Sequence, residues 1–127
     1  MASRTIDRLL IANRGEIAVR IARTARRLGI SPVGVHSSSD RGALHTRSMD
    51  RSVSLGGSTP AESYLRVDAV VAAALANGCD AVHPGYGFLA ENPAAARAVE
   101  AVGLIWVGPT PEQIELLGDK IAAKRAA

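Results

Sequence analysis

Hydrophobic positions along the chain form short apolar runs, and stretches with helical spacing separate these runs. Five runs have the length and composition of strands, at about residues 9–12, 32–36, 52–55, 81–83 and 104–107. The run at 9–12 is uniformly apolar and is expected in the centre of a sheet, whereas 52–55 alternates and is expected at an edge. Strands that alternate with helices form a parallel sheet. The predicted fold is α/β, a Rossmann-like doubly wound parallel sheet of about five strands.

The spacing of apolar residues predicts helices between these strands. A helix from about residue 16 to 28 would bury one stripe, made of Ile17, Ile21, Ala25 and Leu28. Further helices are expected from within 37–40 to about 49, at 63–77 and at 93–102, and a capping-box pattern at 110–113 predicts a last short helix. The helix at 63–77 would bury Val67, Val70, Val71, Ala74 and Leu75.

The loop after the fourth predicted strand combines several turn signals. His83 precedes a proline, which disfavours helical backbone at His83, so the strand should end extended. Gly85 and Gly87 flank Tyr86 and permit backbone angles that a side chain would penalise, which presents Tyr86 on a tight loop. Asn92 followed by proline is a helix start. Loops at the carboxyl ends of parallel strands bind ligands, and this loop is placed to be one.

These loop residues, and the charges after the first strand, also have structural interpretations. His83, at a strand end, is more often a hydrogen-bonded structural residue than an acid or base. Tyr86 could anchor the loop by packing its ring, and Glu91 could offset the dipole of the following helix. Arg14 and Glu16 could form a local ion pair.

The turn after the first strand, Asn13-Arg14-Gly15, does not match the dinucleotide-binding fingerprint. Only Gly15 is present where three glycines are needed, and His36 stands about twenty residues on, where an acid should hold a ribose hydroxyl. A nicotinamide- or flavin-binding module is therefore disfavoured. The turn could still receive an anion, because unpaired backbone N–H groups point out of a helix N-terminus.

Composition sets bounds on the class of protein. The chain has 127 residues, of which 47% are hydrophobic, enough for one domain with one compact core. No apolar run approaches the ~20 residues that span a bilayer, so no membrane partner is expected. Cys79 is the single cysteine, which predicts a core position and a reducing, cytoplasmic compartment. Three scattered histidines and one cysteine make no metal-binding spacing.

Charge is distributed unevenly along the chain, whose net charge is +3. Residues 1–51 hold ten arginines and four acids, whereas residues 52–127 hold five basic residues and eight acids. The basic half could meet phosphates. Nucleic acid is not expected as a partner, because the arginines lie at helical spacing without interleaved aromatic residues or a recognised binding motif.

Four stretches of the sequence form a recognisable set. They are Ile-Ala-Asn-Arg-Gly-Glu-Ile-Ala at 11–18, Val-His-Ser at 35–37 with Asp40-Arg41, His-Pro-Gly-Tyr-Gly-Phe-Leu-x-Glu-Asn at 83–92, and Gly-Asp-Lys at 118–120. In this order, over nearly the whole chain, they resemble the N-terminal domain of biotin carboxylases. The resemblance implies that residues 1–127 are this N-terminal domain, and that the ATP-grasp and C-terminal domains of such enzymes are absent from this stretch of sequence.

The resemblance also implies an activity, the first half-reaction of acetyl-CoA, propionyl-CoA and related carboxylases. ATP and bicarbonate carboxylate biotin at N1, and the biotin is carried on a separate carrier domain. The missing ATP-grasp region would supply the ligands of Mg2+ or Mn2+, so this segment contains no catalytic residue and is predicted to be inactive alone. The alternative is a non-catalytic nucleotide-binding or assembly module of Rossmann type.

Partners and site residues follow from the same resemblance. The implied partners are the ATP-grasp region of the same polypeptide, the biotin carboxyl carrier domain and a carboxyltransferase subunit. Relatives also dimerise through the helix face that carries Arg27, but three arginines there without an acid partner would repel their symmetry mates, so a homodimer stays open. Which acyl-CoA or other acceptor is carboxylated stays open. Lys120 is expected to contact ATP, although by composition alone it would be a solvated lysine at a linker. The expected biotin-side wall of the cleft consists of His83, Gly85, Tyr86, Gly87 and Glu91.

Overall fold

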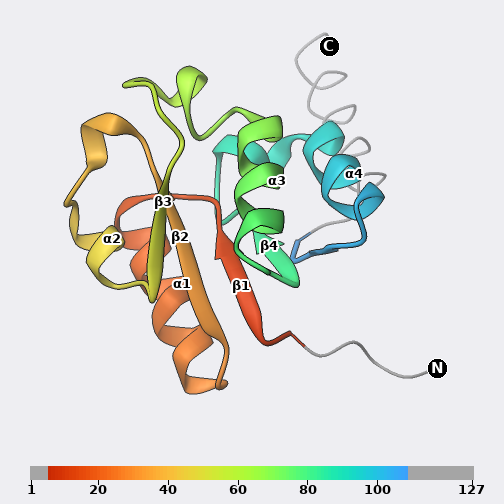
Figure 1. Cartoon of the computed structure of the whole chain (residues 1–127), viewed down its shortest axis with the longest axis horizontal. Helices are drawn as coiled ribbons and strands as arrows, with labels where there is room; N and C mark the ends of the chain where they lie inside the picture. Colours follow the sequence, from red (N-terminus) through yellow and green to blue (C-terminus); the bar gives the residue numbers. More distant parts are fainter. Residues whose placement is uncertain (1–5, 109–127) are drawn as a thin grey trace, which may run out of the picture.

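The computed structural model of the protein describes residues 6–108, which form one five-stranded sheet. The strands are β1 (Arg8–Ile11), β2 (Ser31–His36), β3 (Arg51–Ser54), β4 (Ala81–His83) and β5 (Ile105–Trp106). They are all parallel, in the order β3-β2-β1-β4-β5, so β1 is central and β3 lies at an edge. The predicted fold class, the central first strand and the edge position of the third are confirmed (Figure 1).

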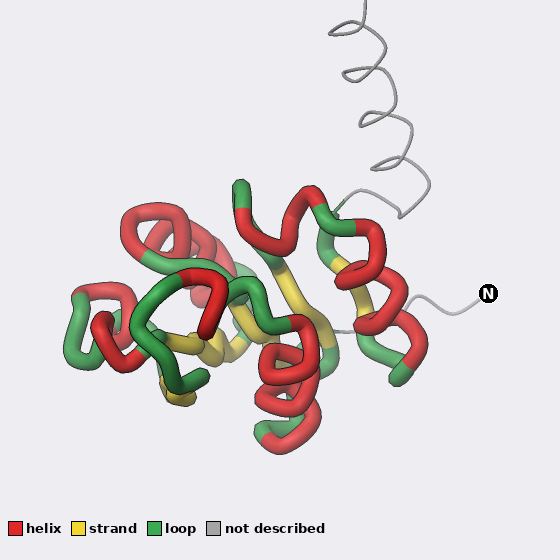
Figure 2. Tube along the Cα trace, turned by 90° about the horizontal axis from the view of Figure 1, so that it is seen from above, coloured by secondary structure: helices red, strands yellow, loops and turns green. Residues whose placement is uncertain are grey.

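Helices cover both faces of the sheet, as the view from above shows (Figure 2). They are α1 (Gly15–Arg27), α2 (Leu44–Arg47), α3 (Val67–Ala76) and α4 (Pro93–Ala101), with 3₁₀ turns at Ser38–Asp40, Pro60–Glu62 and Phe88–Glu91. Successive residues of a strand point to opposite faces. Leu10 therefore packs in the cluster that contains the buried residues of α3 and α4, whereas Leu9 and Ile11 pack with those of α1.

Two of the predicted helices differ from the structure. The helix expected up to about residue 49 is interrupted, because Gly42 has a φ of +79° and separates a 3₁₀ turn from the short α2. The helix expected from residue 63 begins at Val67. Ser63 has non-helical backbone angles and its hydroxyl donates to the carbonyl of Thr59, a local bond that competes with helix formation.

The buried face of α1 shares only Ala25 with the predicted stripe. Its fully buried residues are Ala18, Ala22 and Ala25. Of the predicted stripe, Ile17 and Ile21 are half-buried and Leu28 is 70% exposed. Small alanine side chains let the helix approach the sheet closely, so the larger residues are displaced to its flank. The helix therefore has a second apolar stripe beside the one that contacts the sheet.

The later elements agree more closely with the sequence pattern. Asn92 caps α4, since its side-chain oxygen accepts from the backbone N–H groups of Ala94 and Ala95 at 2.9 and 3.3 Å. In α3 the prediction was partly wrong: Leu75 is 51% exposed, and Ala73 is buried in its place. Cys79 is buried as expected, and burial raises the pKa of its thiol to about 11. No helix within residues 6–108 is both long and apolar enough to cross a membrane.

Candidate functional site

The turn after β1 and the loop after β4 lie side by side at the carboxyl edge of the sheet. β1 and β4 are neighbours, with Ile11 paired to His83 in the register. The chain goes from β1 outward to β2 and β3, then returns to β4 on the other side of β1. This is the topological switch point, where open α/β sheets bind ligands. We define the central loop as residues 84–88.

Backbone geometry gives the central loop its shape. Gly85 and Gly87 have φ values of +71° and +67°, and Phe88 has a φ of +47°, which is unusual for a residue with a side chain. A Cβ on Gly85 would lie 2.7 Å from Asn13 Nδ2 and 2.9 Å from Ile17 Cγ2, whereas one on Gly87 would meet nothing within 4 Å. Gly85 is therefore required both for its backbone angles and for close approach of the loop to α1.

Tyr86 lies at the tip of this loop with 78% of its surface exposed. Its ring is thus directed away from the core. The interpretation of Tyr86 as a loop anchor that packs its ring is wrong for the described part of the chain. Exposure of a large amphipathic side chain on a tightly held loop is typical of a contact residue.

His83 is held at the end of β4 in a defined protonation state. Its Nδ1 accepts a hydrogen bond from the backbone N–H of Gly85 at 3.0 Å. A ring nitrogen that accepts carries no proton, so the neutral imidazole is protonated at Nε2. Burial lowers the pKa of His83, which favours the same neutral form. The imidazole therefore supports the central loop through one nitrogen and offers an N–H donor at the other.

Asn13 links the turn after β1 to the central loop. Its side chain is only 2% exposed, and its Nδ2 donates to the carbonyls of Pro84 and Tyr86, both at 2.8 Å. Its Oδ1 accepts from the backbone N–H of Arg14 at 2.8 Å. The predicted anion-binding turn of Asn13, Arg14 and Gly15 thus has its amide side chain and one backbone donor already engaged. Gly15, with a φ of +63°, is the first residue of α1.

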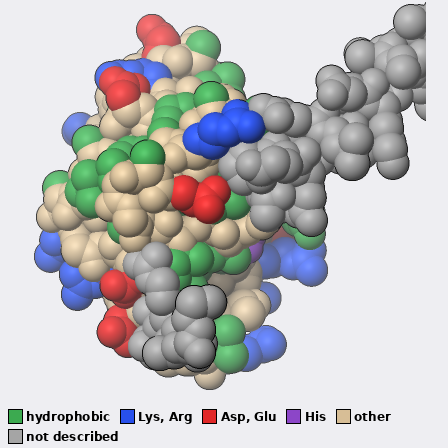
Figure 3. Space-filling view, turned by 90° about the vertical axis from the view of Figure 1, so that its right-hand side faces the viewer, with side chains coloured by type: hydrophobic (Ala, Val, Ile, Leu, Met, Phe, Trp, Pro, Cys, Tyr) green, Lys and Arg blue, Asp and Glu red, His purple; other side chains and the backbone are tan. Residues whose placement is uncertain are grey.

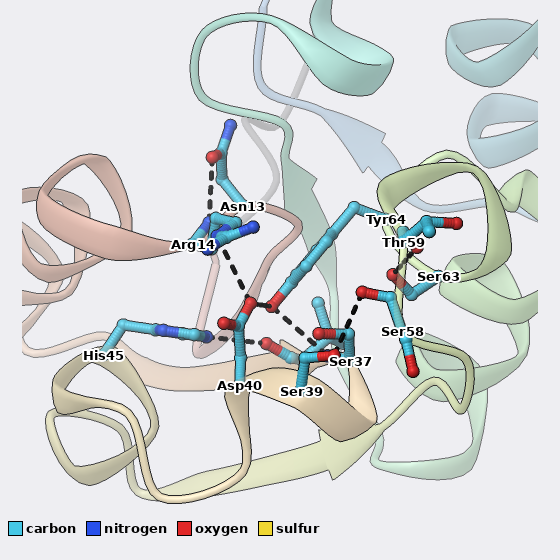
Figure 4. A network of polar contacts seen from close by, with 11 residues as sticks. Asn13, Arg14, Ser37, Ser39, Asp40, His45, Ser58, Thr59, Ser63 and Tyr64 are labelled. Atoms are coloured by element: carbon cyan, nitrogen blue, oxygen red, sulfur yellow. Dashed lines mark hydrogen bonds and ion pairs between the residues drawn. The ribbon is translucent and has the colours of Figure 1, made fainter.

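Arg14 takes part in a second network, drawn in Figure 4, that includes Asp40 and Tyr64. Arg14 Nε lies 3.2 Å from Asp40 Oδ2, and its guanidinium is 5.9 Å from the centre of the Tyr64 ring. The Tyr64 hydroxyl donates to Asp40 at 2.6 Å and accepts from the Ser37 N–H at 3.2 Å. Burial and the hydrogen bond to Asp40 raise the pKa of Tyr64 to about 12. The expected Arg14–Glu16 ion pair is absent from the described residues; the partner of Arg14 is Asp40.

A groove of about 750 Å³ runs along α1, from the central loop at one end to Ile6, Leu28 and Ile30 at the other. Its aliphatic lining includes Ile17, Ile21 and Leu28, the residues of the predicted α1 stripe that are not fully buried. His83, Gly85 and Tyr86 form its rim at the carboxyl edge. On one side of the molecule, arginine side chains lie in separated groups and hydrophobic side chains reach the surface between them (Figure 3).

The other predicted site residues do not join this groove. Gly87 and Glu91 are exposed and are not part of its lining. Lys120 lies outside the described residues. Within residues 6–108, no group of three or more His, Cys, Asp or Glu side chains is arranged to hold a metal ion.

Two features of the site escaped the sequence analysis. Tyr64 and Asp40 were not recognised as partners of Arg14, because the three residues come from different segments. The α1 groove was also missed, although a signal was present: the helix has two adjacent apolar stripes, one of alanines and one with Ile17, Ile21 and Leu28. Two stripes indicate two contact surfaces.

Comparison with known proteins gives matches over almost the whole chain. The sequence model for the biotin carboxylase N-terminal domain matches residues 5–114. The mitochondrial alpha subunit of methylcrotonoyl-CoA carboxylase from Oryza sativa subsp. japonica is 53% identical over 120 residues, covering 94% of this chain and 16% of that protein. Biotin carboxylase from Pseudomonas aeruginosa is 50% identical over 121 residues, covering 95% of this chain and 27% of that protein.

A solved structure gives the same result in three dimensions. The multifunctional pyruvate carboxylase from Rhizobium etli superimposes with a TM-score of 0.87 at 40% identity, covering 94% of this chain and 12% of that one. The chain thus spans about a quarter or less of the length of the relatives it matches.

Proposed function

Because the chain belongs to the biotin carboxylase N-terminal domain family, we propose that it forms one wall of the active-site cleft of an ATP-dependent biotin carboxylase. The complete enzyme would carboxylate biotin at N1 with bicarbonate and ATP. In this proposal ATP activates the bicarbonate, and biotin supplies the acceptor nitrogen. The role of the present chain is to shape the acceptor side of the cleft.

The observation that carries the proposal is the exposed Tyr86 on a rigidly held loop at the switch point. A loop of this kind can hold an aromatic ring against a ligand at little entropic cost, because its backbone is already ordered. His83 adds an N–H donor on the same rim of the groove.

The chemistry of biotin suits these residues. Its fused rings are largely apolar and its ureido carbonyl is a hydrogen-bond acceptor. The groove offers an aliphatic flank from Ile17 and Ile21, and the His83 Nε2–H and the Tyr86 hydroxyl supply donors at its rim. Small-molecule sites have this composition, mostly apolar with a few placed polar groups. In this role the chain's residues orient the ligand and exclude water; none exchanges a proton with it.

The remaining requirements fall on other parts of the enzyme. Lys120 would contact ATP as a point charge near phosphate. Mg2+ or Mn2+ and bicarbonate would be held by the ATP-grasp region of the same polypeptide, so this segment alone would be inactive. Further partners are the biotin carboxyl carrier domain, a carboxyltransferase subunit and a homodimer mate, and a cytoplasmic location stays a prediction. The relatives differ in their named carboxylation reactions, so this domain does not indicate the acceptor.

The test is Tyr86→Ala in the complete polypeptide. We expect the apparent KM for free biotin to rise about tenfold while that for ATP changes less than about twofold, because loss of one oriented contact acts on the ligand it touches. Tyr86→Phe should give a smaller rise, since it keeps the ring and loses only the hydroxyl. Leu75→Ala, which truncates another exposed large hydrophobic side chain, on α3, is the control and should change neither constant.

An unchanged biotin constant in Tyr86→Ala, or a larger effect on ATP, would contradict the proposed role. The rival, a Rossmann-type nucleotide-binding module, is not favoured because the first turn lacks two of the three fingerprint glycines.

A further inference from the structure

The position of the Tyr86 ring depends on the backbone beneath it. The Tyr86 side chain makes no hydrogen bond or ring stacking with any other residue in 6–108, and it is mostly exposed. Whatever orients this ring must therefore act through the peptide groups of the central loop. Besides the bond from the Gly85 N–H to His83, the central loop is held at two points.

The first contact is the Asn13 amide. Both of its N–H bonds are used, one on the carbonyl before Gly85 and one on the carbonyl of Tyr86 itself. Asn13 is buried and its bond to the Pro84 carbonyl is buried as well, whereas the bond to the Tyr86 carbonyl is partly buried. Loss of the amide would leave the buried Pro84 carbonyl without this donor, at the cost of its desolvation. The absence of a Cβ at Gly85 is what allows the amide to approach so closely.

The second contact is the ring of Phe88, at the other end of the loop. Phe88 stacks on Tyr64 with ring centres 5.2 Å apart and planes inclined by 11°. Tyr64 is in turn held by Asp40, and Asp40 by Arg14, which directly follows Asn13 in the chain. The contacts form a closed circuit from Asn13 through the central loop to Phe88, Tyr64, Asp40 and Arg14. The positive φ of Phe88 is maintained inside this circuit.

From this circuit we infer that Asn13 is a positioning residue for Tyr86: its buried amide sets the geometry of the central loop and so the alignment of Tyr86 toward the acceptor. The inference rests on the proposed function, and it reassigns Asn13 from an anion-binding turn to the support of the neighbouring loop. Asn13 itself does not touch the ligand.

The test combines a loop measurement with kinetics. In the isotope-labelled 127-residue chain, Asn13→Ala should accelerate hydrogen exchange of the Gly85 amide by about tenfold or more, since exchange reports local opening of the loop. In the complete polypeptide, Asn13→Ala should raise the biotin KM about tenfold and leave the ATP KM within about twofold. In a Tyr86→Ala background, adding Asn13→Ala should change the biotin KM by less than about twofold, because the two residues act as one unit.

Two further variants separate positioning from general stability. Asn13→Asp keeps the size of the side chain and the acceptor for the Arg14 N–H but removes both donors, so it should reproduce the Asn13→Ala effects. Asn77→Ala is the matched control, because the Asn77 amide also donates to a backbone carbonyl, at the opposite edge of the sheet. It should leave Gly85 exchange and both KM values unchanged.

The outcomes are distinguishable from those of the proposed function. Unchanged Gly85 exchange in both Asn13 variants, or Asn13 and Tyr86 effects on the biotin KM that simply multiply, would overturn the positioning role. An unchanged biotin constant in Tyr86→Ala alone would overturn the proposed function, whatever Asn13 does to the loop.

Discussion

The sheet has an amino edge, where its parallel strands begin, and a carboxyl edge, where they end. Both carry polar networks, and the networks differ in burial. At the amino edge, Arg8 donates to the Asn77 carbonyl at 2.7 Å, Asp80 accepts from the backbone of residues 7 and 8, and Arg26 pairs with Asp50 at 2.9 Å. All of these contacts are exposed. At the carboxyl edge, Asn13 and Tyr64 are almost completely buried.

Burial decides what each network contributes. An exposed ion pair replaces contacts with water that are nearly as favourable, so it contributes little to the free energy of unfolding. When one partner of a buried hydrogen bond is removed, water does not replace it. The remaining polar group then keeps its full desolvation penalty. The amino edge thus adds small increments to stability, whereas the carboxyl edge holds a loop in one geometry. Substitutions at the two edges should therefore have unequal effects.

The largest difference is expected for glycines in the same backbone conformation. Gly85→Ala should lower the free energy of unfolding by about 2–4 kcal/mol, combining an unfavourable positive φ with a clash against Asn13. Gly29, which precedes β2 at the amino edge, has a similar φ of +75° but open space around it. Gly29→Ala should cost only about 1–2 kcal/mol, the conformational part alone. Urea unfolding of the chain measures both, and equal losses would show that close approach to Asn13 adds nothing.

A smaller effect is expected for Tyr64→Phe, which removes one buried hydroxyl. The loss should be about 1–3 kcal/mol, because the buried Ser37 N–H loses its acceptor and the partly buried Asp40 loses one donor. The pKa of Tyr64 is raised from 10.0 to about 12, so its contribution is complete below pH 10 and is lost as the pH rises toward 12. Unfolding measured from pH 8 to pH 12 should therefore show the two proteins converging. A constant difference across that range would contradict the assigned hydroxyl contacts.

The smallest effect is expected for Asp50→Asn at the amino edge. The hydrogen bond from Ser31, followed by the contact with Arg26, lowers the pKa of Asp50 below its ordinary value of 3.8. A carboxyl group whose pKa is lower in the folded state stabilises the fold at pH values above its ordinary pKa. That stabilisation is lost as the pH falls through the pKa of the folded state. The substitution should cost less than about 1 kcal/mol at pH 7, because the pair is exposed. Thermal unfolding at pH 7 and pH 3 tests this, and a loss as large as that of Tyr64→Phe would remove the distinction between the edges.

Much of the fold was predictable because it depends on neighbours in sequence. The strand at 81–83 and the cap of α4 by Asn92 were placed correctly, since proline, glycine and asparagine act on the backbone within a few residues. The helix at 37–49 was wrong for a related reason. Several capping residues suggested one start, but none of them makes a side-chain cap in the structure.

What the sequence determined by itself is thus the succession of strands and helices, the parallel sheet and the tight turn around Tyr86, all of which follow from local backbone preferences and hydrophobic period. Tertiary structure decided which stripe of α1 meets the sheet, because Ala18, Ala22 and Ala25 fit closer than the larger residues beside them. It also decided the partners of Asn13, which lie 71 and 73 positions away. They meet only because β1 and β4 pair in parallel, which brings the ends of both strands to one edge of the sheet.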